Sequence, residues 1–172
     1  MIALGCDPGF ASCGWGVVER VGSTHFLRGQ GTIRTEPRDG TTAERLLTIC
    51  QHLVRLVRQY DPNVVGVEDV ELRARQAAAE HVSRDGLLQT AKVVGLACCI
   101  APSARVVLLR NGEWRGALGI RKAEDVHARL TLFLGPGVAG SVHSRDAIGI
   151  ALAASKLPIA QLKKLVQAGF KR

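Results

Sequence analysis

The chain has 172 residues, of which 47% are hydrophobic and 22% are charged. This length and composition predict one globular domain with one core, and they exclude a disordered chain. Lysine and arginine number 23 against 15 aspartate and glutamate residues, which gives a net charge of +8. The basic excess favours a polyanionic partner, nucleic acid above all, although a generally basic surface would carry the same charge.

The 5 cysteines indicate a reducing compartment. Their number is odd, no C-x-x-C pair occurs, and three of them lie in apolar segments. We therefore expect free thiols in a cytoplasmic protein, with Cys13 the most exposed because it lies in a polar turn. The chain begins directly with a strand and has no uncharged stretch of bilayer length, so we expect neither a signal peptide nor a membrane segment.

Three strands are predicted at the start of the chain: a short apolar run, a return strand that forms a hairpin with it after Pro8-Gly9, and a third strand. They are residues 2–7, Gly14–Val21 and Thr24–Arg34. A helix is predicted over Thr41–Tyr60, where Thr41 and Glu44 fit a capping box and apolar residues recur at helical spacing. Val64–Val70 follows as a strand that is apolar on both faces, which is typical of the centre of a sheet.

The second half of the chain alternates helices and strands. The predicted elements are a helix over Leu72–Ile100, a strand over Arg105–Leu109, a loop or short turn over Gly116–Ile120, a helix over Lys122–Leu134, a glycine-rich loop over Gly135–Ser141 and a helix over His143–Ser155. Pro158–Arg172 is predicted to be a basic helical tail, which leaves residues 1–157 as the folded domain. A meander followed by this alternation indicates an α/β fold with a mixed five-stranded sheet flanked by helices.

Four residues that can bind a metal ion lie where apolar segments start or stop. Asp7 closes the first strand, Glu68 lies near the end of the central strand, and His143 and Asp146 open the last helix, three positions apart. A carboxylate at the end of a buried strand costs free energy unless an opposite charge compensates it. Two strand ends and one helix face could therefore form one cluster of oxygen and nitrogen ligands for Mg²⁺ or Mn²⁺. We call these residues the four site residues.

Each of the four site residues also has an ordinary structural explanation. Asp7-Pro8-Gly9 is a favoured turn sequence, Glu68 can mark a strand that enters solvent, and His143 and Asp146 can cap a helix. Taken singly, the turn and the caps are the stronger interpretations. Only the four residues together favour a metal centre.

Six basic side chains are candidates for contact with DNA phosphates. They are Arg73, Arg75, Arg84, Arg115, Arg121 and Lys122. A solvated charged surface explains these residues about equally well. Phe10 and Trp114 could stack on exposed bases, but core packing is the simpler explanation for Trp114. The sequence has no glycine-rich nucleotide-binding motif and no G-x-S-x-G element, which disfavours nucleotide-cofactor chemistry and a serine hydrolase.

Four blocks of the chain resemble the RuvC family of Holliday junction resolvases. The blocks are Leu4–Gly9 with Gly14–Val17, Arg45 through Glu68, Gln89–Ala97, and His143–Ala147. The resemblance implies a ribonuclease H-like fold, a homodimer, and divalent metal ions held by the four site residues. One departure is Glu71, which stands where the family often has an aromatic residue that stacks in the junction.

The resemblance also implies a mechanism. Two Mg²⁺ ions about 4 Å apart would clamp the scissile phosphate. Asp7 would bridge the ions, and His143 would bind an ion or position or deprotonate the attacking water. Two subunits would nick opposing strands of a four-way junction and leave 5′-phosphate and 3′-hydroxyl ends. The helix over Leu72–Ile100 is the predicted dimer interface, and recombination or branch-migration proteins are candidate partners.

Three alternatives stay open at this point. Another ribonuclease H-like nuclease, acting on RNA, RNA–DNA hybrids or flaps, would share the metal site. A non-catalytic junction-binding module would share the basic charge. A small-molecule kinase of the actin-like superfamily can also end its first strand in Asp-x-Gly, but it needs two domains, for which 172 residues are too few.

Overall fold

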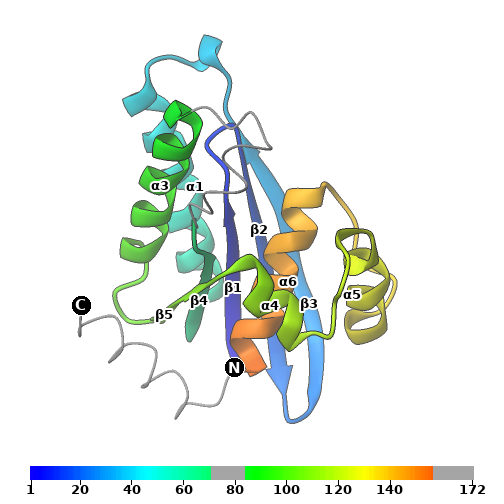
Figure 1. The fold of residues 1–172 in the computed structure, drawn as a ribbon. Helices are drawn as coiled ribbons and strands as arrows, with labels where there is room; N and C mark the ends of the chain where they lie inside the picture. The colour runs from blue at the N-terminus through cyan, green and yellow to red at the C-terminus, as the bar shows by residue number, and fades with distance from the viewer. Residues whose placement is uncertain (71–83, 157–172) are drawn as a thin grey trace, which may run out of the picture.

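A mixed sheet of five strands forms the centre of the fold (Figure 1). The computed structural model describes residues 1–70 and 84–156, apart from the side chain of Arg84. The strands are β1 (Ile2–Pro8), β2 (Ser12–Val21), β3 (Thr24–Arg34), β4 (Val64–Glu68) and β5 (Arg105–Leu109). Their order across the sheet is β3-β2-β1-β4-β5. β1, β2 and β3 pair antiparallel and β4 and β5 run parallel to β1, so the predicted mixed five-stranded α/β fold is confirmed.

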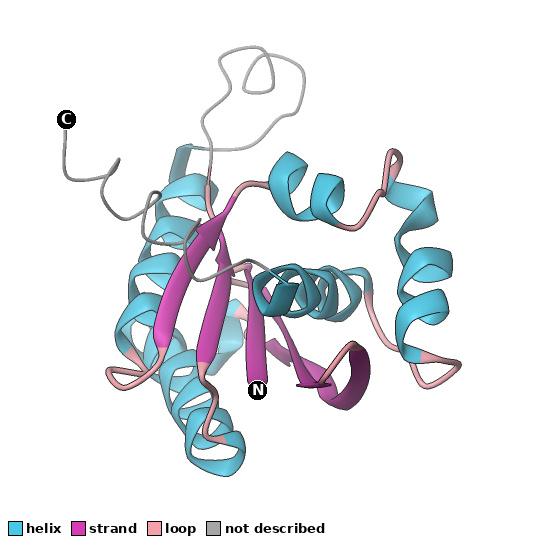
Figure 2. Cartoon of the chain, turned by 90° about the horizontal axis from the view of Figure 1, so that it is seen from below, coloured by secondary structure: helices cyan, strands magenta, loops and turns pink. Residues whose placement is uncertain are grey.

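Helices cover both faces of the sheet (Figure 2). They are α1 (Thr42–Tyr60), α3 (Arg84–Cys99), α4 (Asn111–Ala117), α5 (Val126–Leu134) and α6 (Val142–Lys156), with 3₁₀ turns at Pro37–Asp39 and Ala123–Asp125. α1 and α3 pack on one face, whereas α6 packs on the other with α4 and α5 beside it. Side chains alternate along β1, so Ala3 enters the α6 core and Leu4 enters the α1 and α3 core.

α6 lies directly on the sheet because glycines of the strands face it. A Cβ atom on Gly5 would lie 2.6 Å from the backbone nitrogen of Ala151, and a Cβ atom on Gly16 would lie 2.7 Å from Ile148 Cγ1. Both separations are too short for carbon atoms, so any side chain at these positions would push the helix away. The glycines therefore determine the distance between α6 and the strands β1 and β2.

The loop predicted over Gly116–Ile120 was wrong in its first part, because α4 extends to Ala117. Gly112 and Gly116 lower the helix propensity of this segment, which hid the helix from the sequence pattern. The helix forms because Glu113 Oε2 accepts a hydrogen bond from the backbone nitrogen of Arg110 at 2.8 Å and because Trp114 is fully buried. The burial of Trp114 and the cap at Arg110 therefore stabilise α4 by more than its two glycines destabilise it.

Other local predictions also need correction. β4 ends at Glu68 instead of Val70, because its neighbour β5 ends at the paired residue Leu109. The helix predicted from Lys122 starts as a 3₁₀ turn, and α5 begins at Val126. The expected exposure of Cys13 was wrong, because Cys13 lies in β2 with its side chain in the α1 and α3 core; the exposed cysteine is Cys99.

Two predicted segments lie wholly or partly outside the described residues. They are the basic tail over Pro158–Arg172 and the part of the Leu72–Ile100 helix that precedes Arg84. The helix predicted over His143–Ser155 is confirmed as α6. Within residues 1–70 and 84–156, no helix has the length and apolar character needed to cross a membrane.

We predict that Gly5→Ala lowers the free energy of unfolding by about 3 kcal/mol, the upper end of the usual cost of overpacking. The new methyl group would overlap with the backbone of α6. Gly112→Ala is the matched control, because a Cβ atom there meets nothing within 4 Å and alanine favours the helix. Urea unfolding followed by circular dichroism measures both variants. Equal stability of Gly5→Ala and the original chain would contradict the close contact.

Candidate metal-binding active site

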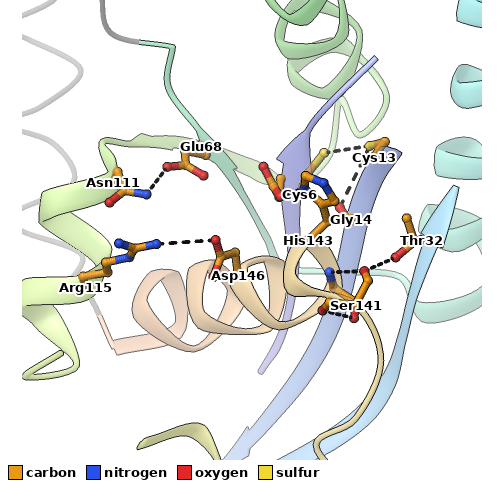
Figure 3. A network of polar contacts seen from close by, with 12 residues as sticks. Cys6, Cys13, Gly14, Thr32, Glu68, Asn111, Arg115, Ser141, His143 and Asp146 are labelled. Carbon is orange, nitrogen blue, oxygen red and sulfur yellow. Dashed lines mark hydrogen bonds and ion pairs between the residues drawn. The ribbon is translucent and has the colours of Figure 1, made fainter. Parts of the chain in front are cut away.

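The four site residues come from three elements that meet at one end of the sheet. Figure 3 labels three of them, Glu68, His143 and Asp146. β1 and β4 are parallel neighbours, and the last residues paired between them directly precede Asp7 and Glu68. The two carboxylates therefore lie side by side on the face of the sheet that α6 covers. α6 adds His143 and Asp146 from its first two turns. The structure thus brings the four predicted residues to one place.

His143 is bound to Asp7. The His143 Nδ1 and Asp7 Oδ2 atoms lie 2.7 Å apart, and the histidine side chain is 47% exposed against 16% for the aspartate. The hydrogen bond to Asp7 raises the pKa of His143, and the negative charges of Asp7, Asp146 and Glu68 raise it further, although burial opposes them. A protonated His143 is thus a counter-charge for the neighbouring carboxylates.

Glu68 and Asp146 are carboxylates in an unfavourable environment. Burial raises the pKa of both side chains, and the charge of Asp7 raises them further. A hydrogen bond from Asn111 Nδ2 to Glu68 Oε1, 2.7 Å long, partly offsets these effects for Glu68. The guanidinium of Arg115, whose Nη2 lies 3.5 Å from Asp146 Oδ2, does the same for Asp146.

The donor set of this site suits a hard divalent cation. The charges of the three carboxylates raise the pKa of His143, and the charge of Asp7 raises those of Glu68 and Asp146, so a cation would relieve the repulsion among the carboxylates. Each carboxylate is instead bonded to a donor of its own, so in the described part of the chain no three such side chains are gathered tightly enough to hold an ion as they stand. Metal binding therefore needs side-chain rotations that bring the free carboxylate oxygens closer together.

The N-terminus of α6 is tied to β3, which fixes the position of His143. Ser141 precedes the helix, and its Oγ accepts a hydrogen bond from the backbone nitrogen of Ser144 at 3.2 Å. The same Oγ lies 2.6 Å from Thr32 Oγ1 on β3. The side chain of Gln30 also binds the loop before α6, through the carbonyl of Gly137 and the backbone nitrogen of Ala139. These residues were not predicted from the sequence, although a serine before an apolar helix is a capping signal.

The candidate DNA-binding residues occupy different environments. Arg115 is half-buried and paired with Asp146. Arg121 and Lys122 are exposed between α4 and α5, and the 3.9 Å pair of Lys122 with Glu124 is solvated. Arg73, Arg75 and the side chain of Arg84 lie outside the described part.

The two aromatic candidates also differ. Trp114 is fully buried, which confirms that it is a core residue. Phe10 is half-buried, next to the Asp7 turn, and the guanidinium carbon of Arg45 lies 4.0 Å from its ring centroid. One ring face of Phe10 is therefore already covered by a cation.

Comparison with known proteins relates this chain to one family. The family described as crossover junction endodeoxyribonuclease RuvC matches residues 3–99. The protein of that name from Synechocystis sp. is 31% identical over 153 residues, which are 87% of this chain and 88% of that protein. The one from Alkaliphilus oremlandii is 39% identical over 70 residues, 41% of this chain and 42% of that protein. The solved structure of Thermus thermophilus RuvC in complex with a Holliday junction substrate has a TM-score of 0.76 at 22% identity, and covers 90% of this chain and 93% of that one.

Fold and site together define a ribonuclease H-like fold with acidic residues at the end of its central strands. The family match covers more than half of the chain, and the Synechocystis relative is covered along most of its length. The chain belongs to the RuvC family, as its four sequence blocks predicted. In the first two curated relatives, the matched region spans only 51% and 42% of the relative's length.

We predict that Ser141→Ala lowers the free energy of unfolding by about 1 kcal/mol, the usual cost of losing a helix N-cap. The variant removes the bonds to Thr32 and to the backbone of Ser144. Ser103→Ala is the matched control, because Ser103 is exposed in the turn before β5. Urea unfolding compares the two. A loss of the same size in both variants would show that Ser141 is not an anchor of α6.

Proposed function

We propose that this protein is a structure-selective endonuclease that resolves four-way DNA junctions. It makes paired, metal-dependent nicks and leaves 5′-phosphate and 3′-hydroxyl ends. The observation that carries the proposal is the meeting of Asp7, Glu68, His143 and Asp146 at one end of the sheet. A net charge of +8 suits a polyphosphate substrate. Relatives named as crossover junction endodeoxyribonucleases give the reaction class.

The proposed cofactor is Mg²⁺ or Mn²⁺, with two ions per site. Nucleases of this family are metal-dependent, and bound divalent ions supply the charge that polarises a phosphate and activates water. Asp7 would hold metal ions together with Glu68 and Asp146, because its charge acts on both of these side chains. His143, which Asp7 holds, is the proposed residue that either binds an ion as neutral imidazole or accepts the proton of the attacking water.

Basic residues near the site are the proposed phosphate contacts. Arg121 and Lys122 are exposed on the connection between α4 and α5, and Arg115 lies at Asp146. Arg73, Arg75 and Arg84 extend the proposed contact surface on the strength of the sequence. Such contacts recognise the shape of the junction without reading its bases.

The proposed setting is the cytoplasm. All the cysteines are free, and the Sγ atoms of Cys6 and Cys13 lie 3.6 Å apart as thiols. Free thiols so close together support a reducing compartment. Recombination or branch-migration proteins are the proposed partners beyond DNA.

We predict that Asp7→Asn slows nicking of a four-way junction by roughly 10²–10³-fold, because the site loses several kcal/mol of metal-assisted stabilisation of the transition state. Junction binding should persist, and the metal-free protein should be no less stable, because one repelling charge is removed while the side chain can still bond to His143. The assay uses an end-labelled junction with Mg²⁺ or Mn²⁺, and with EDTA as the metal-free control.

The same assay separates the proposed function from its alternatives. Duplex, flap and RNA–DNA hybrid substrates are tested beside the junction. Paired nicks in the junction alone support a resolvase. Cutting of the hybrid or the flap instead would keep the metal site and reject junction resolution. Tight junction binding without any cutting, unchanged by Asp7→Asn, would identify a binding module.

We also propose that the protein works as a homodimer through α3. Val93 and Ala97 of this helix are buried against the sheet, while no described residue covers the opposite side. That side forms one exposed stripe at helical spacing, namely Leu88, Ala91, Gly95 and Cys99. Small residues beside one leucine let a second helix approach closely, and two active sites are needed for paired nicks. The stripe supports the predicted dimer interface.

We predict that Leu88→Glu raises the dimer dissociation constant at least about tenfold, because a charge would be buried in the interface at the largest apolar side chain of the stripe. Leu132→Glu on α5 is the matched control, since Leu132 is 76% exposed and Leu88 is 57% exposed. Sedimentation equilibrium measures both variants. Monomeric behaviour of the original chain at assay concentrations would reject the interface.

A further inference from the structure

α4 directs three donor groups at the acidic end of the sheet. Asn111 Nδ2 lies 2.7 Å from Glu68 Oε1, and Arg115 Nη2 lies 3.5 Å from Asp146 Oδ2 (Figure 3). Trp114 Nε1 is buried without a hydrogen-bond partner among the described residues, and its proximity lowers the pKa of Glu68. Asn111 was not among the predicted site residues, although it makes the shortest of these contacts.

We propose that Asn111 is a positioning residue that orients Glu68 for the divalent cation, an inference that rests on the proposed metal-dependent function. An ionised carboxylate only accepts hydrogen bonds, so the amide nitrogen of Asn111 is the atom that faces it. The amide is neutral and therefore fixes Oε1 without neutralising the charge that attracts a cation. Oε2 is left as the oxygen available to an ion. The guanidinium of Arg115 acts differently on Asp146, because its positive charge competes with a cation.

The helix that carries Asn111 is itself held firmly. Trp114, one turn further along α4, is fully buried, and a Cβ atom on Gly149 would lie 2.6 Å from its Cζ3 atom. α4 is therefore packed against α6, the helix that carries Asp146. The amide of Asn111 thus links Glu68 on β4 to the same rigid unit as Asp146. The spacing between two proposed ligands depends on this link.

An ordinary surface hydrogen bond is the competing explanation. Asn111 is exposed, and it is the first residue of α4 but not its N-cap, which is Arg110. Alanine at this position should therefore leave the helix intact. A purely structural role predicts a small change in stability and no change in metal affinity, so the affinity for metal separates the two explanations.

The test measures Mn²⁺ binding to the full chain without DNA, by electron paramagnetic resonance of free Mn²⁺. Asn111→Ala is expected to weaken binding by roughly tenfold, the lower end of the effect of losing a residue that orients a ligand. The Mg²⁺ concentration for half-maximal nicking should rise by the same factor, with the rate recovering at high Mg²⁺. Asn111→Gln, which keeps the amide donor on a longer arm, should restore part of the affinity.

Glu113→Ala is the matched control, because it weakens the cap of the same helix without touching Glu68. Its Mn²⁺ affinity should stay within about twofold of the original chain. An equal loss in Glu113→Ala, or an unchanged affinity in Asn111→Ala, would overturn the role of Asn111 and leave the proposed function intact. No Mn²⁺ binding by the original chain would overturn both.

Discussion

The rest of the structure depends on the direct packing of α6 against the sheet. Glycines of β1, β2 and β4 face α6. Because they have no side chains, the helix backbone lies closer to the strands than any other residue at these positions would allow. Gly14 is the position nearest the site, since a Cβ atom there would overlap with the carbonyl of His143. The first turn of α6 is thereby pressed against the end of β1, beside Asp7. The site exists because no side chain separates the helix from the strands.

This packing has an electrostatic consequence. Three carboxylates end up at one edge of the sheet, where burial and mutual repulsion raise the pKa of Glu68 and Asp146. A fold selected for stability alone would not gather them. In this structure each charge is offset by its own donor, so the repulsion is reduced before any cation arrives. The gathered carboxylates therefore destabilise the fold less than they would without these donors.

Much of the fold and of the site could be predicted from the sequence, because the strands are apolar runs and acidic residues interrupt them. Asp7 and Glu68 were recognisable for that reason, and the three-residue spacing of His143 and Asp146 placed them on one helix face. α4 was not recognisable, because its glycines weaken the helical pattern and because the tertiary contact of Trp114 stabilises it. The proposed role of Asn111 could not be predicted from the sequence either. Its contact with Glu68 spans 43 positions in the chain and follows no periodicity.

The three donors that hold the acids differ in charge, and the difference explains why they are not interchangeable. Asn111 is neutral, His143 changes its charge with its environment, and Arg115 is always positive. A neutral donor orients a ligand and leaves its charge for the metal. A titratable donor offers a counter-charge that can be withdrawn when a cation binds. Under the proposed function, a permanent cation would have to move aside or turn to the substrate phosphate when a metal ion binds, so Arg115 is the residue of the three that we propose to link metal binding to DNA binding.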